Sequence, residues 1–283
     1  MWEAILLGIL QGLTEFLPIS SSAHLRIAGE FLPGIQDPGA TFTAITQIGT
    51  EIAVLVYFRR DLLSILQAWI RWGVATGPAR QRFSDADRQQ VRLGWLIILG
   101  TVPIVVVGYL AQDLIRDSLR SLWIVATVLI VFGLLLLAAD LWGRQQKTLS
   151  SMPMSDGLLA GLAQTLALIP GVSRSGATIA MGRTLGYQRA DATRFSFLLA
   201  VPAVLGSGAY ELRTALLSPE STGAFGLADT VVATVVAGLV GFAVITWLMR
   251  YIQTKSFVPF VVYRIILGST LLFLLSAGVL EPL

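Results

Sequence analysis

Apolar runs of about 20 residues, long enough to cross the hydrocarbon core of a bilayer as helices, recur along this chain of 283 residues. They predict six spans, at residues 41–58, 93–110, 122–142, 194–210, 228–249 and 258–280. Pro103 predicts a kink in the second of these spans. The stretch 62–72 mixes charged and apolar residues and predicts an amphipathic helix lying at the membrane interface.

Two other segments carry polar residues in apolar surroundings, and they resemble each other. Residues 8–25 read GILQGLTEFLPISSSAHL, and residues 157–179 read GLLAGLAQTLALIPGVSRSGATI. Gly8 aligns with Gly157 and Glu15 with Gln164, and each copy then passes through a proline into serines. A duplicated, proline-broken segment of this kind predicts two re-entrant hairpins with a reactive site between them.

Each half of the chain therefore holds one broken segment followed by three spans. This order predicts an all-α polytopic membrane protein with six transmembrane helices and two re-entrant helical hairpins. It forms a single membrane domain, 1–283, with halves 1–142 and 155–283. If each broken segment enters and leaves on one side, three crossings per half give the halves opposite orientations, which is an inverted repeat.

The distribution of basic residues predicts the orientation. Arginines are concentrated in the connection 59–92, which should be cytoplasmic by the positive-inside rule. Arg144, Lys147, Arg250 and Lys255 fall on the same side by counting crossings. The connections 113–120 and 212–227 and both termini then fall outside.

The composition agrees with a membrane protein. Of the residues, 55% are hydrophobic and 13% are charged, whereas a soluble domain carries roughly a quarter charged residues. The lack of cysteine excludes disulfides and thiol catalysis, and the single histidine excludes a metal site made of several histidines. No cleavable signal peptide is expected. Nucleic-acid binding is not indicated by a net charge of +3, because the arginines lie mainly beside the spans.

The first broken segment offers acid–base chemistry. Gln11 and Glu15 are four residues apart and share a helix face. Pro18 ends that helix, and the serines at 20–22 are N-cap candidates for the next one. His24 follows Ser21 by three residues, so its ring can lie near that hydroxyl. The alternative is a serine-capped helix with Glu15 and His24 wetted at the interface. Ionisable groups at membrane depth are costly, which favours the functional interpretation.

The second broken segment offers an anion site. Pro170-Gly-Val-Ser-Arg-Ser-Gly176 delivers two serines and an arginine to a predicted helix start. Free backbone N–H groups there favour anions, and the planar guanidinium of Arg174 suits phosphate oxygens. The alternative is a capped turn with Arg174 snorkelling to lipid headgroups. Together the segments suit a reaction at phosphorus, with a base in one half and an electrostatic cradle in the other. The hydrophobic surroundings suit a substrate with a lipid tail.

The stretches Gln11-Gly-Leu-Thr-Glu15 through His24 and Pro170–Gly176 resemble the (E/Q)xxxE and PGxSRSG motifs of a known family. This family is the bacterial undecaprenyl pyrophosphate phosphatases, also called bacitracin resistance proteins, and the resemblance covers essentially the whole chain. It implies a hydrolase acting on a phosphoric anhydride, which converts undecaprenyl diphosphate to undecaprenyl phosphate and inorganic phosphate. The product is the recycled lipid carrier of peptidoglycan synthesis. The resemblance also implies the bacterial plasma (inner) membrane, with the site opening to the outer (periplasmic) face.

The resemblance assigns roles by position. It implies that the catalytic residues are Glu15, Ser21, His24 and Arg174. It implies that the substrate phosphates are bound by Gln11, Ser20, Ser22, Ser173, Ser175 and Gly176. Either Ser21 or a water attacks the terminal phosphorus, and either His24 or Glu15 takes the proton; the residues alone leave both choices open.

The cofactor and partner expectations are few. The resemblance implies activity helped by Mg²⁺ or Ca²⁺, with Glu15 as the candidate ligand, and no organic cofactor. Because Gln11 is an amide, a two-carboxylate metal site in this segment is disfavoured. The expected partners are a polyprenyl diphosphate lipid and membrane lipids. Glycines at 238–241 permit close helix packing within or between protomers, which leaves a homodimer open.

Two rival functions come from the same features. Inverted repeats with broken helices also occur in transporters, so a transporter or flippase of a lipid phosphate is the main alternative. The lipid phosphatases that use two histidines are set aside, because His24 is the only histidine. Gln47 and Glu51, four apart in a predicted span, either line the cavity or pack between helices.

Overall fold

The computed structural model describes residues 1–283 except 32–37, 78–80, 112–118, 120, 218–224 and 282–283. The regular elements of the described residues are helices, apart from one isolated bridge between Lys147 and Tyr187. In chain order they are α1 Trp2–Thr14, α2 Ser21–Glu30, α3 Gly39–Tyr57, α4 Arg59–Val74, α6 Asp85–Leu110, α8 Leu122–Trp142, η2 Leu149–Ser151, α9 Met154–Thr165, η3 Leu166–Leu168, α10 Arg174–Thr184, α11 Arg189–Leu217, α12 Leu227–Tyr251 and α13 Val258–Ser276.

The long helices match the predicted spans. Among the described residues, α6, α8, α11, α12 and α13 are each long and apolar enough to cross a membrane, and α3 with α4 forms a bent pair that raises the number from 5 to 6. The chain is therefore a multi-pass membrane protein. The predicted interfacial stretch 62–72 lies within α4, which turns from α3 by 76°.

Two helices extend well beyond their predicted spans. Helix α6 begins at Asp85 rather than at 93, because the Ser84 side chain accepts a hydrogen bond from Asp87 N at 3.1 Å and caps an earlier, polar turn. Helix α11 runs to Leu217, so the connection predicted at 212–227 begins later. Parts of the predicted connections lie outside the described residues, namely Pro33, Gly34, Arg80, Asp113, Arg116, Asp117, Arg120 and 218–224.

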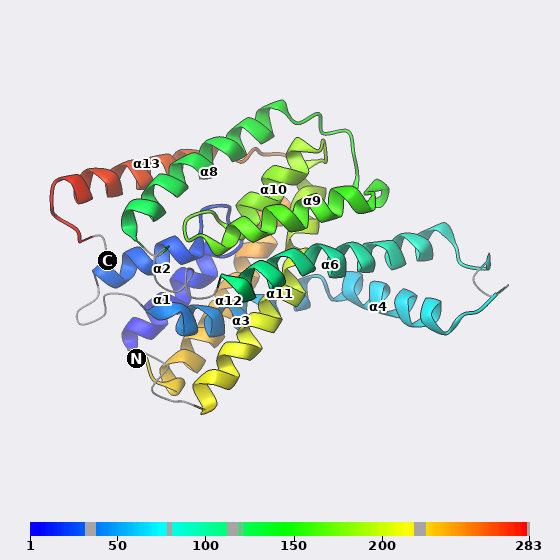
Figure 1. Ribbon diagram of the computed structural model, residues 1–283, viewed down its shortest axis with the longest axis horizontal. Coiled ribbons are helices and arrows are strands. Elements are labelled where there is room, and N and C mark those ends of the chain that lie inside the picture. Colours follow the sequence, from blue (N-terminus) through cyan, green and yellow to red (C-terminus); the bar gives the residue numbers. More distant parts are fainter. Residues whose placement is uncertain (32–37, 78–80, 112–118, 120, 218–224, 282–283) are drawn as a thin grey trace.

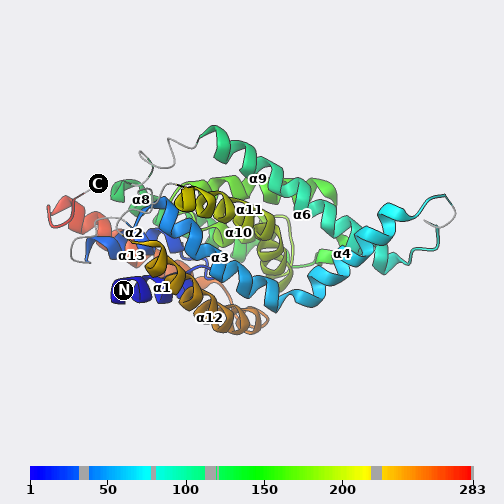
Figure 2. The ribbon, with the colours of Figure 1, turned by 90° about the horizontal axis from the view of Figure 1, so that it is seen from below.

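The helices pack as a bundle from which one hairpin projects. Helices α4 and α6 lie side by side and extend together beyond the rest of the molecule (Figures 1 and 2). In the bundle α12 packs on α1 and α3, α13 on α8, and α9 on α6. The start of α1 and the end of α13 lie toward the same side, away from the projecting tip (Figure 1).

Glycines bring α3 and α12 into backbone contact. A Cβ at Gly49 would lie 1.9 Å from the carbonyl oxygen of Thr234, and one at Gly238 would lie 2.9 Å from the carbonyl oxygen of Gly49. Small residues allow this close approach between membrane helices. The close packing predicted from the glycines at 238–241 thus occurs within the chain.

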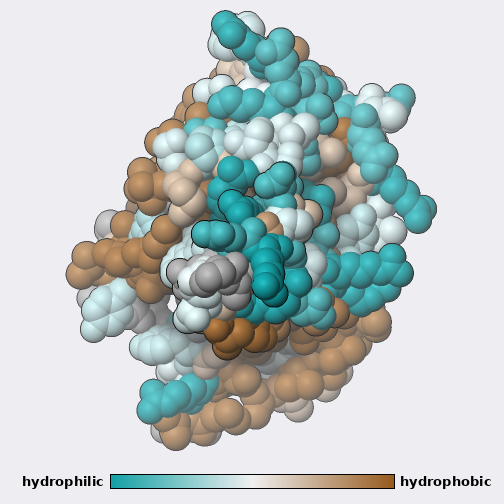
Figure 3. All heavy atoms as spheres, turned by 90° about the vertical axis from the view of Figure 1, so that its right-hand side faces the viewer, coloured by the Kyte–Doolittle hydropathy of each residue, from teal (hydrophilic) through white to brown (hydrophobic). Residues whose placement is uncertain are grey.

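The surface separates into hydrophobic and hydrophilic regions. Exposed apolar side chains cover the flanks of the spans, for example Val105, Leu135, Leu239 and Phe273. Figure 3 views the end from which α4 and α6 project, and hydrophilic residues gather over its centre and top while hydrophobic ones follow its lower edge. Polar residues are also buried between the helices, among them Gln11, Glu51 and Arg264. An apolar exterior around a partly polar interior is the arrangement expected in lipid.

Candidate active site

The two broken segments are built alike at the point where each second helix begins. The N-cap residues are Ser20 for α2 and Ser173 for α10, with φ angles of 74° and 69°. Each side chain accepts a hydrogen bond from the backbone N–H three residues later, at 3.4 Å from Ala23 and 3.2 Å from Gly176. A non-glycine residue with positive φ is uncommon and costs about 1–3 kcal/mol, so surrounding contacts must hold it. The predicted serine caps are confirmed.

Contacts between the two breaks supply that support. The backbone N–H of Gly171 donates to Ser20 Oγ at 3.2 Å, and Ser175 Oγ donates to the carbonyl of Leu17 at 3.3 Å. Residues that are far apart in sequence thus meet at the tips of both broken segments. The meeting of these two polar segments, which the sequence predicts, is observed.

Arg264 of α13 ties both breaks to the bundle. Its side chain is fully buried and donates five hydrogen bonds to backbone carbonyls. The acceptors are Pro18, Val128, Leu129, Gly171 and Val172. Pro18, Gly171 and Val172 lie outside the helices at the two breaks, where an unpaired buried carbonyl is costly, and Val128 and Leu129 belong to the continuous helix α8. A single guanidinium therefore fixes the positions of both breaks.

Glu15 is the hub of the site. Its Oε1 accepts from Arg174 Nη2 at 2.5 Å, and its Oε2 accepts from Ser21 Oγ at 2.5 Å and from Gln11 Nε2 at 2.8 Å. The Glu15 side chain is 5% exposed. Three donors stabilise an ionised carboxylate, and a carboxylate that already accepts a hydroxyl hydrogen bond is placed to take that proton.

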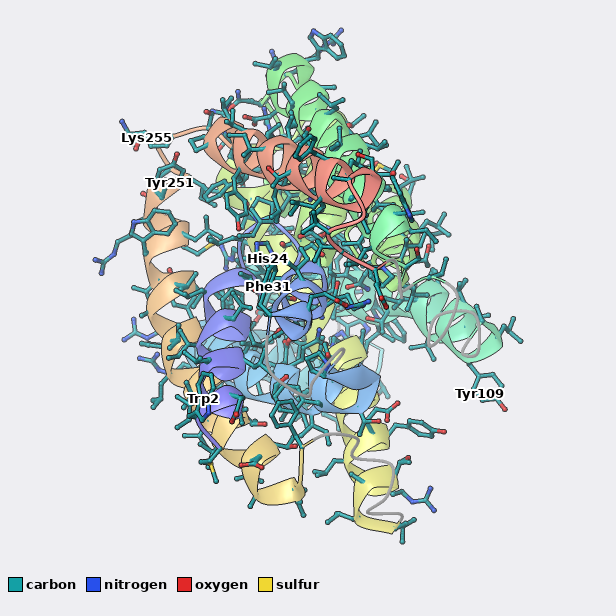
Figure 4. All side chains as sticks on the ribbon, turned by 90° about the vertical axis from the view of Figure 1, so that its left-hand side faces the viewer. Trp2, His24, Phe31, Tyr109, Tyr251 and Lys255 are labelled. Atoms are coloured by element: carbon teal, nitrogen blue, oxygen red, sulfur yellow. The ribbon has the colours of Figure 1, made fainter. Side chains whose placement is uncertain are left out.

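His24 lies apart from this hub. Its Nδ1 is 2.7 Å from the Ser20 carbonyl, and its Nε2 is 2.7 Å from the hydroxyl of Tyr263 on α13, whose ring stacks on the imidazole. The histidine faces α13 in the interior (Figure 4). Both ring nitrogens therefore bond groups other than the Ser21 hydroxyl.

A cavity of about 550 Å³ opens in front of Glu15, Ser21 and Arg174. The serines at 20–22 and Ser173 form its polar floor. Its walls come from α6 and α11 and are mostly apolar, with Ile104, Val105, Gly108, Tyr109, Pro202, Ala203, Val204, Gly206, Ser207, Tyr210 and Glu211. Tyr109 is 80% exposed and projects away from the body (Figure 4). The cavity thus joins a polar, partly cationic end to an apolar one.

The phosphate-binding candidates of the second break surround the start of α10. Ser173 and Ser175 have their hydroxyls 3.1 Å apart. A Cβ at Gly176 would lie 3.1 Å from Arg264 Nη1 and 3.2 Å from Ser173 Cβ, so the glycine leaves room for both. Ser20 and Ser22 face each other similarly across the first break, with hydroxyls 3.2 Å apart. Ser20, Ser22 and Ser173 line the cavity, whereas Ser175 and Gly176 are not among its lining residues.

The residues are a poor fit to a divalent cation held by the protein alone. Both oxygens of Glu15 already accept hydrogen bonds. Among the described residues no group of three or more His, Cys, Asp or Glu side chains is placed to hold a metal ion. Mg²⁺ keeps several waters and is commonly bound through substrate phosphates. The side chains of the described residues therefore do not by themselves complete a divalent-cation site.

Three residues near the site are missed by the sequence reasoning. Arg264 and Tyr263 lie in a predicted span, where an arginine in an apolar run is a signal that could have found the first of them. Glu211 lines the cavity and accepts from Thr41 Oγ1 at 2.9 Å; it lies one residue beyond the predicted span 194–210 and outside the two broken segments that predict the site. Gln47 also lines the cavity, which is the first of the two alternatives that the sequence left open for Gln47 and Glu51.

Comparisons with known proteins cover nearly the whole chain. The family model described as bacitracin resistance protein BacA matches residues 4–270. An undecaprenyl-diphosphatase from Micrococcus luteus is 59% identical over 279 residues, which are 99% of this chain and 98% of the relative. Relatives of the same name from Clavibacter michiganensis and Paenarthrobacter aurescens are 57% and 54% identical over 279 residues, with 98% and 99% of this chain and 97% and 98% of the relatives covered.

Proposed function

This chain belongs to the bacitracin resistance protein family, and on that premise we propose that it is an undecaprenyl-diphosphatase. It hydrolyses undecaprenyl diphosphate to undecaprenyl phosphate and inorganic phosphate, which recycles the lipid carrier and gives bacitracin resistance. One observation carries the proposal. The Glu15 carboxylate accepts from Ser21 and from Arg174 at the polar end of a cavity whose walls are apolar.

The diphosphate lies at the polar end of the cavity. Arg174 and the hydroxyl of Ser173, both of which line the cavity, hold its oxygens, and the prenyl chain follows the apolar walls of α6 and α11 toward lipid. The terminal phosphoryl group then faces Ser21. Fixed donors aimed at phosphate oxygens in a site shielded from water are usually the largest catalytic contribution. Arg174 leaves Glu15 in part when it binds phosphate.

Glu15 is the general base. Ser21 Oγ donates to Glu15 Oε2, so its proton passes to the carboxylate as the oxygen attacks phosphorus. The bond between phosphorus and the bridging oxygen breaks, and undecaprenyl phosphate leaves. Water then releases inorganic phosphate from Ser21. If a water attacks in place of Ser21, Glu15 takes the proton of that water, and general-base help of this kind contributes about 10²–10⁴-fold.

In this mechanism His24 holds the backbone of the first broken segment in place. Its ring joins the Ser20 carbonyl to Tyr263 of α13, and Ser20 is the N-cap beside Ser21. A hydrogen-bonded histidine there holds the strained Ser20 backbone and hence the hydroxyl of Ser21. His24 is therefore a positioning group in this proposal, and Glu15 takes the proton.

The inverted repeat is also part of the proposal. It joins the halves 1–142 and 155–283 and consists of six spans and two re-entrant hairpins. The likeness of Ser20 and Ser173 in φ angle, capping bond and place supports it. The protein lies in the bacterial plasma (inner) membrane, with the basic connection 59–92 in the cytoplasm and the site opening to the periplasmic face. The positive-inside rule supports this orientation.

The described residues alone provide neither a complete cation site nor support for a homodimer. Mg²⁺ or Ca²⁺ would be held mainly by the substrate phosphates and would help to neutralise their charge, since the Glu15 oxygens are occupied by protein donors. The glycines considered for a homodimer pack within the chain, so they give it no support. The proposed partners are thus the lipid substrate and the surrounding membrane lipids.

A transporter of a lipid phosphate is the alternative from another class. Its binding site would use Arg174, and Glu15 would carry a coupled proton. The two functions differ in detergent, where there are no compartments. The purified enzyme releases inorganic phosphate from a long-chain prenyl diphosphate there, and a pure transporter releases none.

A further inference from the structure

One acidic side chain near the site has no role in this mechanism. Glu51 lies in α3 and is only 1% exposed. Its Oε1 has no hydrogen-bond partner among the described residues. A buried polar atom without a partner is costly, and an acidic residue inside a membrane protein is a functional candidate.

The position of Glu51 on α3 turns it toward the site. Gln47, one helical turn earlier and on the same face, lines the cavity together with Glu15. Glu51 interacts electrostatically with both Arg174 and Glu15. The side chain therefore lies behind the cavity wall, within reach of the charges at the hub.

Packing on α12 keeps Glu51 there. A Cβ at Gly241 would lie 2.9 Å from the ring of Phe16 and 3.2 Å from the methyl group of Thr50. Phe16 follows Glu15 and Thr50 precedes Glu51, so both acidic residues are anchored against one point of α12. This packing on α12 places the end of α1 beside α3.

The single positive charge of Arg174 thus acts on two carboxyl groups, those of Glu15 and Glu51. Glu15 is bonded to it directly and also accepts the Ser21 hydroxyl. When Glu15 takes the proton of Ser21, it loses its charge and its ion pair with Arg174 weakens. A second carboxyl group lets the pair hold that proton while one member stays ionised against the guanidinium.

We propose that Glu51 is a positioning residue of this site: a second carboxyl group that acts through Arg174 and Glu15 and holds the guanidinium in place when it leaves Glu15 in part to bind phosphate. The proposal rests on the function proposed above. The site then has two carboxyl groups, and the second comes from α3 instead of from the first broken segment.

The structure also shows where this carboxyl group could be moved. Gln11 Nε2 donates to Glu15 Oε2 at 2.8 Å, and Gln11 Oε1 has no partner among the described residues. A carboxyl group at position 11 would therefore also lie against Glu15. The double variant Gln11→Glu, Glu51→Gln keeps the number of carboxyl groups and changes only their place.

The test measures kcat and KM for phosphate release from a long-chain prenyl diphosphate by the purified full chain. Glu51→Gln, which keeps the shape of the side chain, should lower kcat about 10- to 100-fold with KM changed less than about threefold. The double variant should recover kcat to within about tenfold of wild type. A packing role would not be rescued by a carboxyl group at position 11. Wild-type kcat in Glu51→Gln, or a double variant no faster than the single one, overturns the proposal.

A second pair of variants covers the case in which Glu51→Gln does not fold. Glu51→Asp and Glu51→Asn are matched in size and differ in the carboxyl group. The Asp variant should be at least about tenfold faster than the Asn variant, and equal kcat values overturn the proposal. Wild-type protein that releases no phosphate would instead contradict the proposed function, so the two failures are distinguishable.

Discussion

Arg174 Nη2 donates to Glu15 Oε1 at 2.5 Å across 159 residues of sequence. The bond joins the two breaks, because Glu15 directly follows α1 and Arg174 is the first residue of α10. The side chains are 18% and 5% exposed, so each charge depends on the other. Breaking a buried ion pair by removing one partner costs about 3–5 kcal/mol. This bond couples the assembly of the site to its chemistry.

Replacing Arg174 should nearly abolish turnover. In Arg174→Ala the phosphate loses its fixed cation, and kcat/KM should fall at least about 10²-fold. Arg174→Lys should recover little of it, because an ammonium group cannot present the planar pair of donors that the guanidinium offers to a phosphate. Phosphate release by the purified variants checks this. Turnover near wild type in Arg174→Ala would show that the phosphate is held elsewhere.

Ser21 can be tested as nucleophile by trapping. With substrate labelled in the terminal phosphate, acid quenching in the first turnover should leave phosphoserine at Ser21. Ser21→Ala should lose that label and most of its activity, whereas Ser22→Ala, a partly buried neighbour whose hydroxyl faces Ser20 and not Glu15, should stay within about tenfold of wild type. Full activity in Ser21→Ala would exclude the serine as nucleophile, and a water activated by Glu15 would then be the attacking group.

Glu15 should matter more than His24 for proton transfer. Glu15→Gln keeps the shape but removes the base, and kcat should fall about 10²- to 10⁴-fold. Tyr263→Phe keeps the ring stacked on His24 and removes the hydroxyl bonded to Nε2, so kcat should fall less than about tenfold. Steady-state kinetics of both variants checks the order. A larger loss in Tyr263→Phe than in Glu15→Gln would make His24 the base.

Arg264 should be a major source of stability for the breaks. Arg264→Met removes the donor of the carbonyls of Pro18, Gly171 and Val172 at the breaks, and each unsatisfied buried group costs about 1–3 kcal/mol. The melting temperature in detergent should drop by at least about 5 °C. Arg194→Met is the control, because Arg194 is 36% exposed in its pair with Asp61 and should shift melting little. Equal shifts in the two variants would contradict this role.

The spans could be predicted because lipid makes their pattern simple. Predicted residues 122–142 and 228–249 coincide closely with α8 and α12, whose outward faces must be apolar for their whole length. The caps at Ser20 and Ser173 were also predictable, since proline followed by serine restricts the local backbone. The inverted repeat and the sidedness of the membrane stay predictions.

The partners of the site residues could be predicted only in part. The bond between Gln11 and Glu15 follows from helical spacing, as expected. The environment of His24 cannot be predicted from helical spacing, because it depends on Tyr263, which is 239 residues away in the sequence. Arg264 reaches both breaks and Glu51 lies behind the cavity wall only through the packing of α13 and α3. Local pattern carries no information on such contacts.

Phosphate release from undecaprenyl diphosphate by the purified protein in detergent tests the central claim most directly. The account predicts stoichiometric inorganic phosphate and undecaprenyl phosphate, and loss of at least about 10²-fold of the rate in Glu15→Gln. A melting temperature of Glu15→Gln equal to that of wild type would show that the variant loses catalysis and not folding. A well-folded wild-type protein that binds the lipid and releases no phosphate would contradict the account and leave a transporter.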